Sequence, residues 1–349
     1  MADNPFRLIR DIAASRDRNE QKLLSNRLER ALREQKRLPI EKDHALFSYI
    51  GAEQAFVAGD WTGWRPTVAL GRLPNSQVSV ALIRFASDAR LEYKIHVGER
   101  LILDNLNPLK CSNGLGGENS VLEMPRYRAR RYMGGASTRP LTPIHWKAGG
   151  REIKLYLPAK EAGRYPLLLF HDGLDYIDKV KADGLLDDLI RRRKIPPCVA
   201  AFVPPVDRMS EYWRGMDGYM QAIVEDLMPL LFAKAPIDPT RCVSVGASLG
   251  GLLSLRLTMD YPQVFSRALC QSGAFQVDEK GLEERLKLPL PIKVYFDNGV
   301  YESDLTAAND KLAEAILKRT NAKRTVASAG HNWTAWADRL PAALEWVMK

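Results

Sequence analysis

The chain has 349 residues, of which 46% are hydrophobic and 27% charged, a composition that excludes a disordered protein and a small disulfide scaffold. Its net charge of +9 permits acidic partners, but the sequence contains no zinc finger and no recognition module for DNA or RNA, so nucleic-acid binding is not expected. The N-terminal sequence lacks the apolar run of a signal peptide, and no stretch of about 18 apolar residues predicts a membrane span. We therefore expect a cytoplasmic protein of about two domains without membrane contact.

The four cysteines are widely spaced and form no CxxC pair. No cluster of histidine and cysteine has the spacing of a zinc site. The cysteines are interpreted as reduced structural thiols, and we expect the protein to require neither a metal nor a cofactor.

Residues 1–40 are predicted to form an amphipathic helical segment, because leucine and isoleucine recur at helical spacing from residue 6 to residue 37. The apolar face of this segment has to pack against another apolar surface. We expect this segment to dock on its own chain, and a dimer contact is the alternative.

Residues 41–125 contain short alternating apolar runs separated by turn residues, which predicts a small β-sandwich. The stretches AFVAGDWTGW, EYKIHVGERLILDNLNP and GGENSVLEM resemble the Ig-like early-set, glycogen-binding-type sandwich that precedes many catalytic domains. In that family a tryptophan pair and a lysine can hold a glucan, and Trp61, Trp64 and Lys94 fall in similar places. The alternative interpretation gives both tryptophans a place in the core or in an interface.

Residues 126–148, rich in Pro, Arg and Gly, are predicted to be a linker. From residue 149 to 349 apolar strands alternate with helices, which predicts an α/β domain with a mostly parallel sheet covered on both faces. Catalytic groups in such a domain lie at the carboxyl ends of the strands. The predicted helices are residues 183–193, 217–234, 250–260, 305–319 and 335–348.

The segment CVSVGASLGG predicts a nucleophile elbow centred on Ser248. A buried strand runs into Gly246, and a helix begins after Ser248. The serine has to adopt a strained backbone conformation, so side chains two residues before or after it would collide with the adjacent strand or helix. Glycine at positions 246 and 250 removes them. Ser248 is therefore the predicted nucleophile.

A serine hydroxyl needs a base of suitable pKa, in practice a histidine. Of the five histidines, only His331 follows the serine, as the order serine, acid, histidine of α/β-hydrolases requires. The acid is expected on the loop after the strand KVYFDNG, where it can turn back toward the imidazole and fix its tautomer. Glu302 is preferred, with Asp304 second and Asp297 third.

The oxyanion of a tetrahedral intermediate needs two backbone N–H donors. The amide of Leu249, directly after the nucleophile, is one of them. The other is expected from the strand–turn segment LLLFHDGLDY, where Gly173 or Leu174 can present its amide, and Leu174 is the residue chosen here. Asp172 is interpreted as shaping this turn.

Five stretches together resemble the enterochelin (ferric enterobactin) esterase family, part of the esterase D-like group of α/β-hydrolases. They are LLLFHDGLDY, IPPCVAAFVPPVDRMSEYW, VGASLGGLLSLRLTMDYPQVFSRALCQSGAF, NGVYE and AGHNWTAW. The resemblance covers residues 150–349, and the preceding sandwich fits it. It implies hydrolysis of the ester bonds of a cyclic or linear catecholoyl-serine siderophore, which frees iron.

A ferric tris-catecholate is a trianion with aromatic faces, so cations and aromatic rings near the strand ends are candidate substrate contacts. Arg208 could instead form a loop-fixing ion pair with Glu211, and His171 could instead be a packed strand-end residue. The predicted substrate-binding residues are Arg208, Arg214, Trp333 and His171, with Tyr212, Trp213 and Trp336 as further candidates.

The predicted function is a serine esterase that acts through an acyl-enzyme on a small-molecule ester, with an iron-siderophore as the implied substrate. One alternative is a carbohydrate esterase of feruloyl or acetyl type that uses the sandwich to hold glycan. The other is a non-catalytic binding protein on a hydrolase scaffold. The sequence gives no indication of the oligomeric state.

Overall fold

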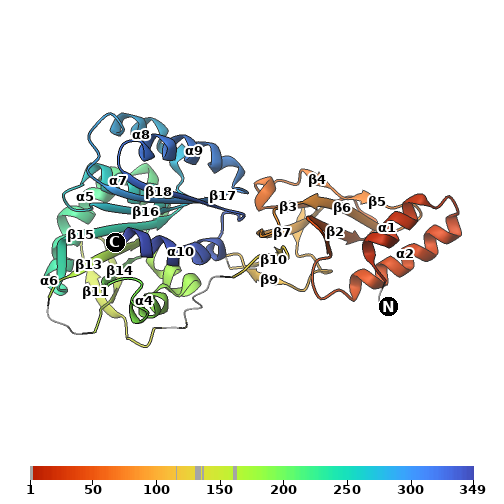
Figure 1. Cartoon of the computed structure of the whole chain (residues 1–349), viewed down its shortest axis with the longest axis horizontal. Helices are drawn as coiled ribbons and strands as arrows, with labels where there is room; N and C mark the ends of the chain where they lie inside the picture. Colours follow the sequence, from red (N-terminus) through yellow and green to blue (C-terminus); the bar gives the residue numbers. More distant parts are fainter. Residues whose placement is uncertain (1–2, 115, 130–134, 136, 160–162) are drawn as a thin grey trace. The chain divides into compact units, whose positions relative to one another are not determined.

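The computed structural model describes residues 3–349 except 115, 130–134, 136 and 160–162, together with the backbone but not the side chains of residues 303 and 304. The chain divides into two compact units (Figure 1). Unit 1 is Met1–Arg128 with Val300–Asp304 and Ala327–Asn332, and unit 2 is Ala129–Gly299 with Leu305–Val326 and Trp333–Lys349. Two short segments from late in the sequence thus belong to the unit formed by the N-terminal part.

Unit 1 begins with two helices, α1 (Pro5–Ala14) and α2 (Arg18–Arg33). Asn4 caps α1 and Asp17 caps α2, each side chain accepting hydrogen bonds from two backbone amides of the first turn. The buried apolar faces of both helices share a core with Leu46 and Val78 from the strands of the same unit. The structure thus has two amphipathic helices in this segment, and their apolar faces pack on strands of the same chain.

The rest of the N-terminal part forms two antiparallel sheets with the orders β1-β2-β6-β5 and β4-β3-β7-β10-β9, and β8 pairs with β7. Alternate residues of β2, β3 and β7 face one common core, as a half-buried strand requires. The elements are β1 (Ile40–Glu41), β2 (His44–Ile50), β3 (Ala55–Gly59), a 3₁₀ turn η1 (Asp60–Thr62), β4 (Val68–Ala69), β5 (Gly71–Arg72), β6 (Val78–Arg84), β7 (Arg90–Val97), β8 (Arg100–Ile102), β9 (Lys110–Ser112) and β10 (Glu118–Glu123).

The ring of Trp61 lies in this core, against Phe47, Phe85 and Tyr93 at centroid distances of 5.4, 4.9 and 6.3 Å. These contacts favour the core interpretation of Trp61 over the glycan-binding one.

Unit 2 contains an eight-stranded sheet of order β11-β12-β14-β13-β15-β16-β17-β18. The pairings from β14 through β13, β15 and β16 to β17 are parallel, whereas β11 and β12 add antiparallel strands at one edge. The strands are β11 (Thr142–Trp146), β12 (Arg151–Tyr156), β13 (Tyr165–His171), β14 (Val199–Val203), β15 (Ile237–Ala247), β16 (Arg267–Gln271), β17 (Lys293–Gly299) and β18 (Asn321–Ala327).

The helices of unit 2 follow the strands as the sequence pattern predicts, except that α3 and α8 are additions and the predicted helix 217–234 is divided into α5, η4 and α6. They are α3 (Gly173–Asp175), α4 (Ala182–Arg191), α5 (Met216–Ala222), α6 (Met228–Lys234), α7 (Leu249–Asp260), α8 (Glu279–Arg285), α9 (Ser303–Leu317) and α10 (Trp333–Val347). Single π-helical turns are η2 (Tyr176–Val180), η3 (Ser210–Arg214) and η4 (Ile223–Leu227), and η5 (Phe275–Asp278) is 3₁₀.

Both faces of this sheet are covered, which explains why the inner strands β13, β14, β16 and β17 are buried along almost their whole length. Leu167 and Leu169 of β13 pack in one core with α5, α6, α7 and α8, whereas Leu168 and Phe170 pack in the other with α4 and α10 (Figure 1).

Strand β11 lies within residues 126–148, which the sequence predicts as a linker. It is short and contains Pro143, a residue tolerated only at sheet edges, so its pattern is weak. Residues 130–134 and 136 of the same stretch lie outside the described residues.

None of the helices in the described part of the chain combines the length and the hydrophobicity needed to cross a bilayer.

Candidate active site

Ser248 sits at a strained turn between β15 and α7. Its backbone angles are φ 57° and ψ −121°, a region that a residue with a side chain rarely adopts. A Cβ on Gly246 would lie 2.3 Å from the carbonyl oxygen of Gly250, so glycine is required at position 246. At position 250 the nearest atom, Asp172 Oδ2, would be 3.3 Å away, so that requirement is weaker. The predicted strand, turn and helix are confirmed, and Ser248 is half-buried.

Two amide-rich turns lie at the carboxyl ends of neighbouring parallel strands. Leu249 begins α7, directly after Ser248, and Leu174 lies in the first turn of α3, directly after β13. Amides in the first turn of a helix have no acceptor within the helix, so they can serve an external oxygen. A Cβ on Gly173 would lie 2.2 Å from the carbonyl carbon of Phe202, which shows how tightly this turn packs on β14.

The predicted histidine and the preferred acid lie together in unit 1. His331 belongs to the segment Ala327–Asn332 and Glu302 to the segment Val300–Asp304. The Nδ1 of His331 is 3.4 Å from Oε2 of Glu302. The Glu302 side chain is fully buried, while 30% of the His331 side chain is exposed. A buried carboxylate on Nδ1 leaves Nε2 of the imidazole for proton transfer.

The third-ranked acid, Asp297, has other partners. Its Oδ1 accepts from Nε of Arg339 at 2.9 Å, and its Oδ2 accepts from Nε2 of Gln271 at 3.3 Å. Asp297 has no exposed surface, so this ion pair is a buried structural one. The side chain of Asp304, the second-ranked acid, lies outside the described residues.

Arg208 pairs with Asp172 rather than with Glu211, which corrects the alternative drawn from the sequence. Its guanidinium donates to both carboxylate oxygens of Asp172 at 2.8 and 2.9 Å. Glu211 instead receives a bidentate pair from Arg151 at 2.6 and 2.7 Å. Asp172 has φ 54°, so it shapes the turn before α3, as expected, and also fixes Arg208.

His171 is a packed strand-end residue, so its prediction as a substrate contact is wrong. The side chain has no exposed surface, and its Nε2 lies 2.9 Å from the hydroxyl of Ser244. Burial lowers the pKa of His171 to about 3, because the charged imidazolium would lose its hydration. A ring so enclosed and neutral is part of the core.

Of the remaining predicted substrate contacts, Arg214 is exposed and lies over the ring of Trp213, 5.5 Å from its centroid. Trp333 packs edge-on against Tyr176 and Trp336, with Lys179 5.1 Å from its ring centroid. Arg214 and Trp213 are thus an exposed cation–aromatic pair, whereas Trp333 is partly buried among other rings.

The sequence reasoning missed a buried carboxyl group in unit 1 that touches the segment carrying His331. Oδ2 of Asp60 accepts a hydrogen bond from Nδ2 of Asn332 at 3.1 Å. The two residues are separated by 272 positions, and the GDW turn around Asp60 carries no recognisable catalytic signal.

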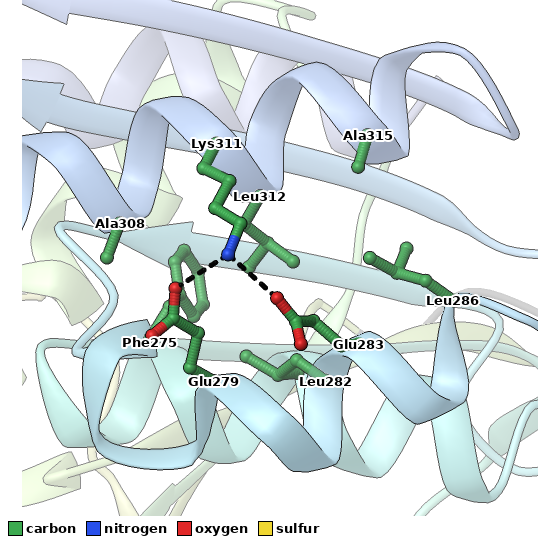
Figure 2. Close-up of a pocket in the computed structure, with 9 residues that line it drawn as sticks. All are labelled: Phe275, Glu279, Leu282, Glu283, Leu286, Ala308, Lys311, Leu312 and Ala315. Carbon is green, nitrogen blue, oxygen red and sulfur yellow. Dashed lines mark hydrogen bonds and ion pairs between the residues drawn. The ribbon is translucent and has the colours of Figure 1, made fainter.

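A separate pocket in unit 2 lies between α8 and α9 (Figure 2). Its volume is about 170 Å³, its floor is apolar, and Lys311 bridges Glu279 and Glu283 at its mouth. None of the predicted site residues lines it. Within the described residues, no group of three or more His, Cys, Asp or Glu side chains is arranged to hold a metal ion.

Comparison with known proteins links the chain to esterases. It is 25% identical over 281 residues to an iron(III) enterobactin esterase of Dickeya dadantii, covering 69% of this chain and 64% of that protein. An iron(III) enterobactin esterase of Escherichia coli K12 is 27% identical over 259 residues, covering 67% of this chain and 64% of that protein. These matches therefore span less than two thirds of the relatives' own length.

Solved structures share the fold. The ferric enterobactin esterase of Salmonella typhimurium superposes with a TM-score of 0.73 at 21% identity, covering 88% of this chain and 95% of that one. The Shigella flexneri enterobactin esterase, solved in the presence of enterobactin, gives a TM-score of 0.71 at 22% identity, covering 88% and 94%. The family model described as "putative esterase" matches residues 148–347, more than half of the chain. The chain therefore belongs to the putative esterase family.

Proposed function

We propose that the protein is a serine esterase in which Ser248 is the nucleophile, His331 the general base and Glu302 the residue that orients it. The observation that carries this proposal is the Ser248 turn, with φ 57° at the carboxyl end of a buried parallel strand and, at position 246, a glycine whose replacement would overlap the backbone of Gly250. Such strain persists only where the surrounding structure enforces it, and it is typical of functional sites.

In the proposed reaction, His331 Nε2 takes the proton of Ser248 as the hydroxyl oxygen attacks the ester carbonyl carbon. The amides of Leu249 and Leu174 donate to the resulting oxyanion. When the tetrahedral intermediate collapses, the C–O bond to the alcohol breaks and His331 returns the proton to the leaving oxygen. A water molecule, deprotonated by His331, then attacks the carbonyl carbon of the acyl-enzyme. When this second tetrahedral intermediate collapses, the C–O bond to Ser248 breaks, His331 returns the proton to the Ser248 oxygen, and the acid is released. Glu302 stabilises the imidazolium through Nδ1–H in both steps.

The proposed substrate is an ester of a catecholoyl-serine siderophore, with its iron as cargo. Relatives named iron(III) enterobactin esterase support this choice, as does the fold shared with an enzyme solved in the presence of enterobactin. On this chain, Arg214 with Trp213 offers a cation and a ring to an anionic aromatic ligand. Arg208, one third exposed, adds a second cation whose orientation Asp172 fixes.

The proposed domain organisation follows the sequence analysis. Residues 41–125 would be an Ig-like early-set β-sandwich after the N-terminal helices, and residues 149–349 an α/β-hydrolase domain with a mostly parallel sheet. The parallel pairings of β13 to β17 and the antiparallel sheets of unit 1 support this assignment. A cytoplasmic location remains a prediction from the sequence.

The test compares wild type with Ser248→Ala on p-nitrophenyl butyrate and on ferric enterobactin, with release of dihydroxybenzoylserine followed by mass spectrometry. Wild type should hydrolyse both, and Ser248→Ala should lose activity by a factor on the order of 10⁶ while keeping its Tm. Equal turnover by the two proteins would overturn the nucleophile assignment. Hydrolysis of feruloyl or acetyl polysaccharide esters without hydrolysis of the siderophore would contradict the proposed substrate.

A further inference from the structure

Asp60 is a buried carboxyl group in direct contact with the segment that carries His331. It begins the turn η1 after β3 and is 4% exposed. Its Oδ2 accepts the backbone N–H of Glu92 at 2.9 Å and the side-chain amide of Asn332 at 3.1 Å. Its Oδ1 has no hydrogen-bond partner within the described part of the chain. Burying a carboxyl group with one bare oxygen opposes folding, so its position calls for another explanation.

Gly330, the residue before His331, lies against the same carboxyl group. A Cβ on Gly330 would be 2.0 Å from Asp60 Cγ and 2.1 Å from Oδ2. The φ of Gly330 is not in the left-handed region, so its backbone conformation would admit a side chain. The three nearest atoms to that Cβ all belong to Asp60, which makes this carboxyl group the obstacle. Asp60 thus contacts the residue on each side of His331.

Backbone contacts hold the rest of the segment. Arg90 of β7 donates its N–H to the carbonyl of Ser328 at 3.2 Å and forms a parallel bridge with Ala329. The carbonyl of Ala329 accepts the N–H of Tyr301 at 3.2 Å. This bond joins the segment Ala327–Asn332, which carries His331, to the segment Val300–Asp304, which carries Glu302. Each contact restrains a chain that carries one proposed catalytic group.

The segment Val300–Asp304, which carries Glu302, is also held by contacts with the N-terminal part of the chain. The hydroxyl of Tyr301 accepts the N–H of Ala86 at 2.9 Å, and its ring packs edge-on against Phe85 at 5.8 Å. Tyr301 directly precedes Glu302. Both members of the His331–Glu302 pair therefore lie next to residues held by the N-terminal sheets.

We propose that Asp60 is a positioning residue: by bonding Asn332 and packing on Gly330, its carboxyl group holds the segment on both sides of His331 and so orients the imidazole toward Glu302. This inference rests on the proposed esterase function and adds to it that residues of the N-terminal part are needed for turnover of any ester. Burial raises the pKa of Asp60 to about 7, against a weaker opposing effect of its bond to Glu92 N–H, so a neutral amide is a fair replacement for it.

The test is a double-mutant cycle on the full chain with p-nitrophenyl butyrate. Gly330→Ala should lower kcat at least tenfold with KM changed less than twofold, because the added methyl group meets Asp60 and displaces the histidine. In an Asp60→Gly background, the obstacle is gone, so Gly330→Ala should lower kcat less than threefold further. Gly218→Ala, with no atom within 4 Å of its Cβ, is the matched control and should leave kcat unchanged.

A conservative variant separates positioning from simple loss of structure. In Asp60→Asn the amide oxygen can accept both hydrogen bonds while the NH₂ group takes the position of the bare Oδ1, so kcat should stay within threefold of wild type. Asp60→Ala should lower kcat at least tenfold. The imidazole resonances of His331, followed by NMR, should move in Gly330→Ala and Asp60→Ala and match wild type in Asp60→Asn.

The outcomes distinguish this inference from the proposed function. If wild type shows no hydrolysis that depends on Ser248, the proposed function fails. If that hydrolysis is present but Gly330→Ala keeps full kcat, or loses it equally in both backgrounds, the positioning role of Asp60 is overturned. Should Gly330→Ala fail to fold, Asp60→Asn against Asp60→Ala decides the matter, and equal kcat for these two overturns the inference.

Discussion

The turn at Ser248 and the segments that carry His331 and Glu302 are held in position in different ways. Ser248 is held by residues within 26 positions of it: its carbonyl accepts from the amides of Gly251, Leu252 and Ala274, and its own N–H donates to the carbonyl of Gln271 at the end of β16. The His331 segment is fixed by Asp60 and Arg90, more than 200 positions earlier in the sequence. The proposed nucleophile is therefore held by residues close to it in sequence, whereas the proposed base depends for its position on residues far away in sequence.

The largest expected effect is a loss of kcat when His331 or Glu302, the two residues held by distant parts of the sequence, is replaced. His331→Ala should lower kcat by a factor on the order of 10⁵–10⁶, because Ser248 loses its base. Glu302→Gln should lower kcat by about 10⁴-fold, because the imidazole loses the carboxylate that fixes its tautomer. Steady-state kinetics measure both, with Tm as the control for folding. Full activity in Glu302→Gln would exclude Glu302 as the acid.

The variant Asp297→Ala tests whether Asp297, on β17 of unit 2, is the catalytic acid in place of Glu302, which belongs to unit 1. Asp297→Ala removes the buried carboxylate that pairs with Arg339, so the free energy of unfolding should fall by about 3–5 kcal/mol. Activity per folded molecule should stay within about tenfold, since Asp297 is not the proposed acid. Urea titration gives the first quantity and active-site titration the second. Loss of turnover with unchanged stability would reverse the assignment.

Gly246→Ala tests the local construction of the Ser248 turn. The new methyl group would overlap backbone atoms of Gly250, which cannot move aside as a side chain can. Such overpacking typically costs about 1–3 kcal/mol, and we expect a value at the upper end together with loss of kcat. Gly218→Ala, in open space on α5, should show neither effect. Equal denaturation midpoints and kcat for the two variants would contradict a sterically required glycine.

The smallest expected effect is a pH dependence of the free energy of unfolding that comes from His171, the last residue of β13. The pKa of His171 is lowered to about 3, so between about pH 6.5 and 3 the unfolded chain binds a proton that the folded one cannot. Stability from this group is complete above pH 6.5 and falls with pH, by about 2 kcal/mol at pH 5. Urea titrations at pH 8 and 5 should show this loss in wild type and not in His171→Gln.

An unchanged difference between pH 8 and pH 5 in His171→Gln would show that His171 is not buried as a neutral group.

The sequence predicted the parts of the site whose requirements are local. Gly246, Ser248 and Gly250 lie within five residues, and each glycine has a steric reason that can be stated from the sequence alone. Chain order selects His331 among the five histidines, whereas it admits Glu302, Asp304 and Asp297 alike as the acid. The strands β13 to β17 and the helices between them followed from runs of apolar residues, because a sheet covered on both faces needs apolar side chains on both.

Partners distant in sequence were predicted poorly. Glu211, three residues away, is the partner of Arg208 that sequence proximity favours, but the turn before α3 brings Asp172 to it from 36 positions earlier. The residues next to His171 in the sequence do not indicate whether its imidazole binds substrate or packs in the core. Its complete burial beside Ser244, which only the structure shows, places it in the core.

The sequence by itself indicated the proposed chemistry, because a strained serine turn and the order of the proposed nucleophile, acid and base are encoded in short segments. The tertiary structure alone decided which residues hold those groups still. Asp60, Asn332 and Gly330 meet only because the chain returns to its N-terminal sheets after more than two hundred residues. A contact between such distant residues leaves no periodic or local pattern, since neither partner's neighbours need to change to form it.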